Sequence, residues 1–325
     1  MSRDSPAHEL TVALFCYNQA NFVADAIAAL YSALPATSEL LIFDDHSSDG
    51  SVSIITKSLR EEPQPRLFFN ESNRGLIPNL NTALEVAKGR YIFFAAADDL
   101  IYPQMLTRCL NLLRKYPEAG LCSTMSDQID EQGRLLGRIE SGMPSLTDDY
   151  LSPSQSLRFL MRNDSWFMGN VAVYRADALR RIDGFRPELM SFSDGFNCRL
   201  LALKFGACFI PEALGAWRLM ASGYAASTAR DRERSLTIGN TAIALMNEEF
   251  ADYFPASYSR RWLKRYLFHS ATSADQQALV LRNRLSKLGR LAVYMKLFWA
   301  LFWYRPFDVY PAVHKRLLGI FRRSS

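Results

Sequence analysis

The stretch Tyr91-Ile-Phe-Phe-Ala-Ala-Ala-Asp-Asp99 runs from apolar side chains directly into two adjacent carboxylates. A short apolar run of this kind is typical of a strand that is buried on both faces. Two other apolar runs, Leu10–Phe15 and Leu40–Phe43, are also followed by polar residues. Because segments with helical spacing separate these runs, the pattern predicts a mainly parallel sheet with right-handed crossovers and helices on both faces.

Periodicity and turn signals extend this pattern along the chain. Helices are predicted at residues 22–34, 52–59, 78–87 and 103–115, and further strands at 67–69 and 120–124. The polar stretch 128–150 contains three glycines and a proline, which favours a loop. Beyond it, we expect helices at 153–162, 176–181 and 194–205, and strands at 171–174 and 208–210.

Composition excludes several classes of protein. The chain has 325 residues, of which 49% are hydrophobic, so it can bury a large core and is not disordered. Five cysteines without a CxxC pair argue against a disulfide framework or a zinc ribbon, and they favour a reducing compartment. The first ten residues lack the apolar segment of a secretory signal, and no run of 18 uncharged apolar residues exists. We therefore expect a cytoplasmic protein.

Charge is distributed unevenly along the sequence. Residues 260–325 carry a net charge of +12, whereas the first 259 residues carry −7. This basic tail contains an aromatic stretch at 291–304 that lies between Arg290 and Arg305. One interpretation is a helix in the headgroup region of an anionic membrane, on the cytoplasmic face of the inner membrane. The alternatives are packing on the body of the protein or a homodimer contact; nucleic acid is not expected, because no recognised nucleic-acid motif is present.

Polar clusters follow three of the predicted strands: Tyr17-Asn18, Asp44-Asp45 and Asp98-Asp99. In open α/β sheets, ligands bind beyond the carboxyl ends of the strands. Adjacent carboxylates there are suited to Mg²⁺ or Mn²⁺ that also takes diphosphate oxygens. Two structural alternatives remain open. The acids at 44, 45 and 49 could cap their own turn, and one acid of the pair at 98 and 99 could cap the next helix.

Taken together in this order, the motifs resemble the GT-A, family-2-type glycosyltransferases. The resemblance covers about residues 10–225 and implies a GT-A fold: a mixed, mainly parallel sheet flanked by helices, with a C-terminal helical extension. It implies a domain at 1–225, with a nucleotide-sugar half at about 8–125 and an acceptor half at about 126–225, followed by the basic aromatic region 226–325. The segments that carry it are Phe15-Cys-Tyr17-Asn18, Phe43-Asp44-Asp45-His-Ser-Ser-Asp49-Gly50-Ser51, Asn73-Arg-Gly75, Asn81, Lys88-Gly89-Arg-Tyr91, Ala97-Asp98-Asp99, Gly184-Phe185, Pro187-Glu-Leu189 and Asp194.

The resemblance also implies a role for each site residue. Tyr17 and Asp45 would hold the base of the donor, and Asp98 would lie near the ribose or a metal-bound water. Arg218 would approach the diphosphate from a loop, and Arg74 would contact the diphosphate or the base. Phe15, through its backbone, and Asn18 would also contribute to donor binding. Asp99, with Asp98, would hold Mn²⁺ or Mg²⁺. Asp194 would deprotonate the acceptor hydroxyl. The family's Asp-x-Asp-Asp reads Ala96-Ala-Asp-Asp here, and Asp194 is followed by Gly195.

One carboxylate base on the attacking face implies a single in-line displacement with inverted stereochemistry. The predicted function is transfer of a sugar from a nucleotide-sugar, with a UDP-sugar favoured, to a saccharide or lipid-linked acceptor in surface polysaccharide or lipopolysaccharide biosynthesis. Two alternatives stay open at this point: a sugar-nucleotide binding module without catalysis, and a nucleotidyltransferase on a related fold. The latter would need a Gly-rich basic loop near the first strand, where the sequence has Tyr17-Asn18-Gln19-Ala20 instead.

Overall fold

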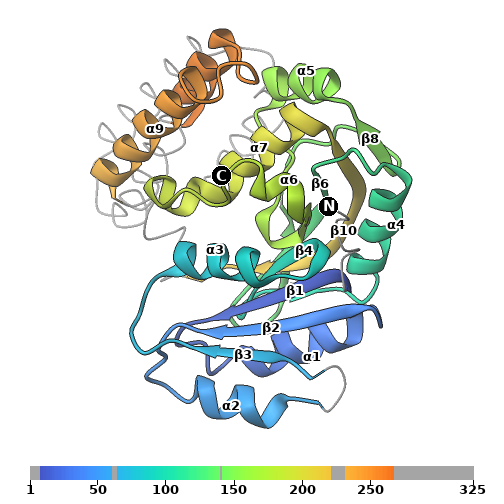
Figure 1. Ribbon diagram of the computed structural model, residues 1–325, viewed down its shortest axis with the longest axis vertical. Coiled ribbons are helices and arrows are strands. Elements are labelled where there is room, and N and C mark those ends of the chain that lie inside the picture. Colours follow the sequence, from blue (N-terminus) through green and yellow to red (C-terminus); the bar gives the residue numbers. More distant parts are fainter. Residues whose placement is uncertain (1–7, 61–63, 140, 221–230, 267–325) are drawn as a thin grey trace, which may run out of the picture. The chain divides into compact units, whose positions relative to one another are not determined.

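The computed structural model describes residues 8–60, 64–139, 141–220 and 231–266. These residues form one ten-stranded mixed sheet with helices packed on it (Figure 1). The strands are β1 (His8–Cys16), β2 (Ser38–Asp44), β3 (Arg66–Phe69), β4 (Gly89–Ala96), β5 (Leu100–Ile101), β6 (Leu121–Ile129), β7 (Leu135–Arg138), β8 (Asp149–Leu151), β9 (Ala172–Arg175) and β10 (Ala207–Arg218).

The strand order is β3-β2-β1-β4-β9-β6-β10-β5, with β7 beside β6 and β8 beside β10. The first four strands pair in parallel, as the βαβ pattern predicts. The second half is mixed, because β9 runs antiparallel to both β4 and β6, whereas β10 runs parallel to β6. The predicted α/β class with a mixed sheet is confirmed.

Helices connect the strands on both sides of the sheet (Figure 1). Most of them bury one apolar side, and α7 is buried over most of its length because other elements surround it. They are α1 (Val23–Ala33), α2 (Ser51–Ser58), α3 (Leu76–Val86), α4 (Met105–Lys115), α5 (Pro153–Asn163), α6 (Ala176–Arg180), α7 (Ser193–Phe205) and α9 (Arg232–Asn247), with the short 3₁₀ segments η1 (Gly169–Val171) and η2 (Pro187–Phe192).

Two hydrophobic cores lie on the two faces of the sheet. Successive side chains of β1 point to opposite faces of the sheet. Val12 and Leu14 lie in the core that α1, α2 and α4 cover. Ala13 and Phe15 point into the opposite core, which α3, α5, α6 and α7 cover. Because successive side chains of a strand face opposite sides, a strand apolar at every position must be covered on both faces. The fully buried pattern of β2 follows the same rule.

The region predicted as a loop at 128–150 is partly a strand region, and that prediction is wrong. β6 continues to Ile129, and a tight turn at Gly133 (φ +78°) returns the chain as β7. Leu135 and Leu136 of β7 are both exposed, so the period-two pattern that marks a half-buried strand is missing. β8 is a three-residue strand that pairs with the distant start of β10, which no local signal reveals.

The residues after β10 add a helical layer to the second half. Phe250 and Phe254 lie 5.8 and 5.6 Å from Phe196 of α7, measured between ring centroids. Trp262 stacks on Phe192 at 4.9 Å. The chain divides into two compact units after residue 267, and the predicted headgroup helix at 291–304 lies outside the described residues. Within the described residues, every helix is too short or too polar to cross a bilayer.

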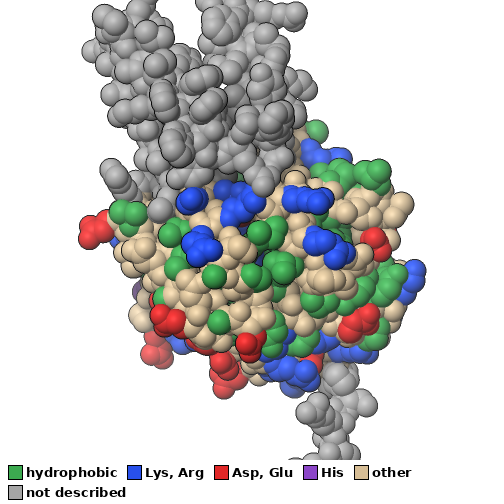
Figure 2. Space-filling model, turned by 90° about the horizontal axis from the view of Figure 1, so that it is seen from above, with side chains coloured by type: hydrophobic (Ala, Val, Ile, Leu, Met, Phe, Trp, Pro, Cys, Tyr) green, Lys and Arg blue, Asp and Glu red, His purple; other side chains and the backbone are tan. Residues whose placement is uncertain are grey.

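Basic side chains gather on one face of the described chain. Figure 2 shows several Lys and Arg side chains in blue across the upper half of this view, and others among the Asp and Glu side chains toward the lower edge. The guanidinium of Arg265 donates to the carbonyl of Arg162 at 2.8 Å, so the basic stretch at 260–265 lies beside α5. The exposed basic residues of these two segments are Arg158, Arg162, Arg260 and Lys264.

Candidate active site

The carboxyl ends of β1, β2 and β4 meet at one edge of the sheet. In the register, Phe15 lies opposite Phe43 and Ala96. The pairing continues one residue further on each side of β1, where Asp45 and Ala97 donate their backbone N–H groups to β1 carbonyls at 2.9 and 3.0 Å. The polar residues that follow these three strands therefore emerge side by side.

Asp45 is buried and accepts three hydrogen bonds from the loop between β3 and α3. Its Oδ1 accepts from Asn70 Nδ2 at 2.7 Å and from the N–H of Arg74 at 2.9 Å, and its Oδ2 accepts from the N–H of Gly75 at 2.8 Å. Burial alone would raise the pKa of Asp45, but these donors together hold that pKa below its ordinary value. The carboxylate therefore stays ionised and fixes the loop, and the Arg74 side chain is exposed beside it.

Tyr17 and Asn18 continue β1 toward the same edge. Asn18 adopts the left-handed conformation (φ +52°), and its Oδ1 accepts from the N–H of Ser48 at 2.8 Å. Its own N–H donates to Ser47 Oγ at 2.9 Å. These contacts tie the end of β1 to the turn after β2 and leave the ring of Tyr17 48% exposed, where it can stack on a planar group.

The acids of the turn after β2 differ in whether their hydrogen-bond donors lie within the turn or outside it. Asp44 accepts from the N–H and the hydroxyl of Ser47, and Asp49 accepts from the corresponding groups of Ser51. The turn-capping alternative is therefore correct for Asp44 and Asp49. Asp45 instead makes its contacts with the loop after β3.

The Asp98-Asp99 turn between β4 and β5 is held by Arg218. Asp99 Oδ1 accepts from the N–H of Arg218 at 2.8 Å, and Arg218 Nε donates to the carbonyl of Asp98 at 2.8 Å. Its Nη1 donates to the carbonyls of Asp130 and Glu131 in the β6–β7 turn at 2.9 and 3.2 Å. The sequence predicts Arg218 on a loop that approaches the diphosphate. In the structure it is the last residue of β10, it is 4% exposed, and main-chain carbonyls engage its guanidinium.

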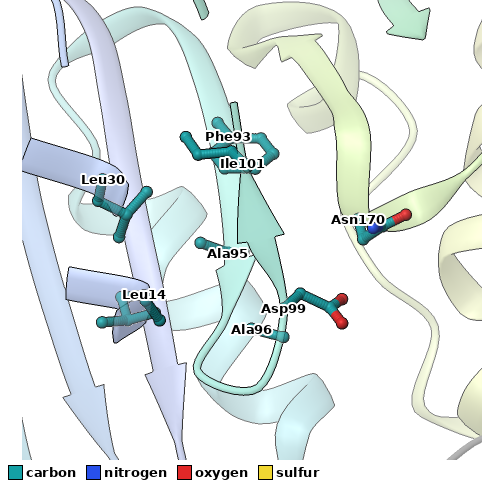
Figure 3. Close-up of a pocket in the computed structure, with 9 residues that line it drawn as sticks. Leu14, Leu30, Phe93, Ala95, Ala96, Asp99, Ile101 and Asn170 are labelled. Carbon is teal, nitrogen blue, oxygen red and sulfur yellow. The ribbon is translucent and has the colours of Figure 1, made fainter. Parts of the chain in front are cut away.

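Burial raises the pKa of Asp99 well above its ordinary value, and the charge of Asp98 raises it further against the opposing effect of Arg218. Burial also raises the pKa of Asp98, while the charge of Arg218 lowers it. Asp99 lines a small pocket with apolar residues of β1, β4 and β5 and with Asn170 (Figure 3). Its carboxylate points out of the turn, toward the side on which Asn170 lies (Figure 3).

Neither Asp98 nor Asp99 caps the following helix. The N-cap residue of α4 is Gln104, which makes no side-chain capping hydrogen bond. The capping alternative for this acid pair is therefore wrong, and the two carboxylates lie together at a strand end, where the charge of Arg218 offsets part of the cost of burying them.

Asp194 lies in the first turn of α7, where a carboxylate interacts favourably with the helix dipole. Its Oδ1 accepts from the N–H of Gly195 at 2.6 Å. Its Oδ2 lies against Gly169 of η1, since a Cβ atom built on that glycine would be only 2.1 Å away. Burial raises the pKa of Asp194, and the Gly195 N–H and the charge of Arg199 partly offset this rise. Arg199 is buried beneath the turn and donates to the carbonyl of Gly195 at 2.7 Å.

η1 lies between the donor-side acids and Asp194. It contacts β4, β6, β10 and α7. Its Gly169 touches Asp194, and the next residue, Asn170, lines the pocket that contains Asp99 and donates to Ser126 Oγ at 3.1 Å. This short segment therefore links the surroundings of Asp99 to Asp194.

Phe15 is placed in the core rather than in the open site. Its ring is 9% exposed and stacks with Phe43 at 5.2 Å, and its carbonyl accepts from Ala97. Phe15 can therefore contribute to donor binding only indirectly, by holding the end of β1 in position.

Asp98 and Asp99 are the residues that could hold a divalent cation. They are hard oxygen donors. Burial raises the pKa of both acids, and a bound cation would favour their ionised forms. Among the described residues, no cluster of three or more His, Cys, Asp or Glu side chains is arranged to hold a metal ion. This donor set fits Mg²⁺ or Mn²⁺, which are commonly held by one or two carboxylates together with substrate phosphates.

Residues 11–183, more than half of the chain, match the family model for glycosyl transferase family 2. The chain belongs to this family. This glycosyltransferase is 30% identical over 252 residues to the uncharacterized protein MT1568 of Mycobacterium tuberculosis, covering 72% of this chain and 76% of that protein. It is 23% identical to the poly-beta-1,6-N-acetyl-D-glucosamine synthase of Staphylococcus epidermidis over 64% of this chain and 49% of that synthase.

Two solved structures share the fold of this glycosyltransferase. S. aureus TarS (residues 1–349) in complex with UDP-GlcNAc superposes with a TM-score of 0.61 at 18% identity, covering 85% of this chain and 76% of that chain. The mannosyltransferase PcManGT of Pyrobaculum calidifontis, in complex with GDP-Man and Mn²⁺, superposes with a TM-score of 0.56 at 18% identity, covering 93% and 84%. The predicted GT-A fold and the prediction of a glycosyltransferase are confirmed.

Sequence reasoning missed two residues that contact or support Asp194, the predicted base. Gly169 touches Asp194, and Arg199 supports the turn that carries it. The resemblance places residues 165–170 only within the acceptor half at about 126–225. No local pattern singles out one glycine within it, because the contact with Asp194 arises only from tertiary packing.

Proposed function

We propose that the chain is a metal-dependent, inverting glycosyltransferase that moves a sugar from a nucleotide-sugar to an acceptor hydroxyl. The observation that carries this proposal is the link between acids from distant parts of the chain. Asp45 and Asp99 follow β2 and β4, the two strands that flank β1, at one edge of the sheet. η1 joins the surroundings of Asp99 to Asp194. This arrangement provides a donor side and an acceptor side around one site.

On the donor side, Tyr17 stacks on the base and Asp45 accepts from a base N–H. The exposure of the Tyr17 ring and the ionised state of Asp45 support these roles. Asn18 holds the β1 end in place, Asp98 lies toward the ribose, and the exposed Arg74 side chain can reach the diphosphate. Nucleotide-sugars in the two related structures, UDP-GlcNAc and GDP-Man, support this donor class, and UDP-sugars are the first choice to test.

Asp99, together with Asp98, would hold Mn²⁺ or Mg²⁺. When bound, the cation supplies positive charge that stabilises the departing nucleoside diphosphate. Arg218 holds the Asp98-Asp99 turn through its N–H and its guanidinium, so we assign it to positioning this turn rather than to direct contact with the diphosphate.

On the acceptor side, Asp194 takes the proton of the attacking hydroxyl. Its raised pKa makes it a stronger base than an ordinary carboxylate, and the offsetting charge of Arg199 favours its ionised form. The hydroxyl oxygen attacks the anomeric carbon while the bond to the diphosphate oxygen breaks. Since one displacement occurs on one face, the anomeric configuration inverts.

A thermal-shift screen tests the donor class directly. UDP, UDP-GlcNAc, GDP and GDP-Man are each added with and without Mn²⁺. Saturation at about 100 times Kd stabilises the native state by about 2.7 kcal/mol. We expect the nucleotide effect to require Mn²⁺ in the wild type and to disappear in Asp99→Asn, but to persist in the exposed control Glu85→Gln. Equal shifts in wild type and Asp99→Asn would remove the metal assignment.

A rate measurement tests the base. Asp194→Asn should lower nucleoside diphosphate release from the best-binding nucleotide-sugar by about 10²–10⁴-fold, with donor binding unchanged. NMR of the first released sugar should show the inverted anomer. Wild-type rates in a folded Asp194→Asn variant would exclude this residue as the base.

For the setting, we propose a saccharide or lipid-linked acceptor in surface polysaccharide or lipopolysaccharide synthesis, with the protein peripheral on the cytoplasmic face of the inner membrane. The basic tail sequence and the exposed basic residues beside α5 support contact with anionic lipid. The similarity to a polysaccharide synthase supports the pathway class. A homodimer contact through the same tail is the competing proposal.

Sedimentation with phosphatidylglycerol vesicles separates these two settings. The double variant Arg158→Glu with Lys264→Glu should bind the vesicles less than wild type, and the charge-matched control Lys57→Glu with Lys88→Glu should bind as wild type. Equal partitioning of all three proteins would contradict membrane attachment.

A further inference from the structure

We infer that Gly169 is a positioning residue for Asp194. Because residue 169 has no side chain, the carboxylate of Asp194 can occupy the position from which it acts as the base. This inference rests on the proposed role of Asp194. The evidence is the contact between η1 and α7, in which a Cβ atom on residue 169 would lie 2.1 Å from Asp194 Oδ2 and 3.2 Å from its Cγ. Both distances are below ordinary van der Waals contact.

The backbone of Gly169 does not itself require glycine. Its φ lies outside the left-handed region, in contrast to Gly75 and Gly184. An alanine could therefore adopt the same backbone conformation without strain. What glycine provides here is space, and that space is occupied by the carboxylate of Asp194.

η1 cannot easily move away from a new methyl group. Val171 is fully buried and packs against Gly215 of β10, where a Cβ atom would lie 2.6 Å from Val171 Cγ1. Asn170 is hydrogen-bonded to Ser126 of β6 at 3.1 Å. The segment is therefore held by two central strands, while Asp194 Oδ2 is the end of a side chain that can rotate.

The Gly169→Ala variant should consequently fold, with the Asp194 carboxylate displaced by about 1 Å or turned to another rotamer. A misplacement of this size costs about 10²-fold in rate when the group acts in the transition state. Donor binding should be unchanged, because the residues assigned to the donor lie at the ends of β1, β2 and β4 and in the loop after β3.

The experiment compares four proteins: wild type, Gly169→Ala, Asp194→Asn and the double variant. The readouts are the rate of nucleoside diphosphate release from UDP-GlcNAc or GDP-Man with Mn²⁺, whichever binds more tightly, the donor Kd by thermal shift, and the pH dependence of the rate. Water takes the acceptor position in this assay. Gly50→Ala is the matched control, because a Cβ atom there meets its neighbours at 3.8 Å.

We expect Gly169→Ala to lose about 100-fold in kcat with an unchanged donor Kd and a shifted acidic limb of the pH profile. In the Asp194→Asn background it should cause no further loss, because it acts through that carboxylate. Wild-type kcat in Gly169→Ala, or a further loss in the double variant, would overturn the inference. If Asp194→Asn itself is fully active, the base assignment in the proposed function fails; if Asp194→Asn is inactive and Gly169→Ala is active, this inference alone fails.

Discussion

Asp45, which we propose for donor binding, also contributes to the stability of the fold. Its pKa is lower in the folded state than the unfolded value of about 3.9. A depressed folded-state pKa contributes stability that is fully present above the unfolded pKa and is lost as the pH falls through the folded pKa. Asp45 therefore stabilises the protein at neutral pH and ceases to do so in acid.

We predict that Asp45→Asn lowers the free energy of unfolding by about 2 kcal/mol at pH 7, because the amide can accept at only one atom. The difference from wild type should narrow as the pH falls from about 4 toward 3. Urea unfolding at several pH values measures it, with the exposed Glu85→Gln as control. A gap that stays constant across this pH range would show that the charge of Asp45 is not responsible.

Single residues were predictable where the chemistry follows a strand. Asp45, Asp98 and Asp99 stand directly after apolar runs, and parallel register brings such ends together. Gly169 and Arg199 were not predictable, because they reach Asp194 through the packing of η1 and α7. Arg218 was identified, but the carbonyls that engage its guanidinium come from a turn that the sequence does not place.

Among the elements, β10 ends in a residue, Arg218, that connects two turns of the proposed site. The Arg218 guanidinium joins this strand to the Asp98-Asp99 turn and to the β6–β7 turn, and it also lies over the ring of Phe22 at 4.7 Å. A buried cation with main-chain partners from two turns fixes their relative position.

We predict that Arg218→Met lowers the free energy of unfolding by about 2–4 kcal/mol, because it leaves buried carbonyls without donors. It should also weaken the Mn²⁺-dependent thermal shift produced by UDP, since the acid turn loses its support. The control is Arg134→Met on the neighbouring turn, where the side chain is 77% exposed and we expect no resolvable change. A normal Mn²⁺ response in Arg218→Met would limit Arg218 to a stabilising role.

Elements with strong periodicity were predicted well, and short edge strands were not. The helix at 153–162 has its proline and a capping box at Ser152, and the structure has it at Pro153–Asn163. β7 and β8 were missed because each has few residues and gains its hydrogen bonds from other strands. Their existence depends on sheet pairing, which local sequence does not encode.

At the scale of the whole molecule, the helical layer after β10 packs against α7, the helix that carries Asp194. Trp262 is 2% exposed and stacks on Phe192 and Tyr266, each at 4.9 Å. Phe192 is the N-cap residue of α7, two positions before Asp194. Residues near the end of the described chain are thus packed directly beneath the proposed base.

We predict that Trp262→Ala lowers the free energy of unfolding by about 3–5 kcal/mol through loss of buried aromatic contacts. It should also lower the rate of nucleoside diphosphate release more than it changes donor Kd, because α7 loses support and the donor strands do not. Leu236→Ala on α9, 41% exposed, should change both quantities little. Chemical denaturation and the release assay on both variants measure this, and equal loss of donor binding would argue against a local effect.

β9 has a consequence for how the enzyme works through its reaction cycle. It is hydrogen-bonded to β4 on one side and to β6 on the other, so the donor and acceptor halves share one uninterrupted backbone ladder. Hinge bending between the halves would have to break those pairings, which makes large-scale closure around substrates too costly to accompany each turnover. We therefore expect substrates to enter and products to leave without a change in the distance between the halves.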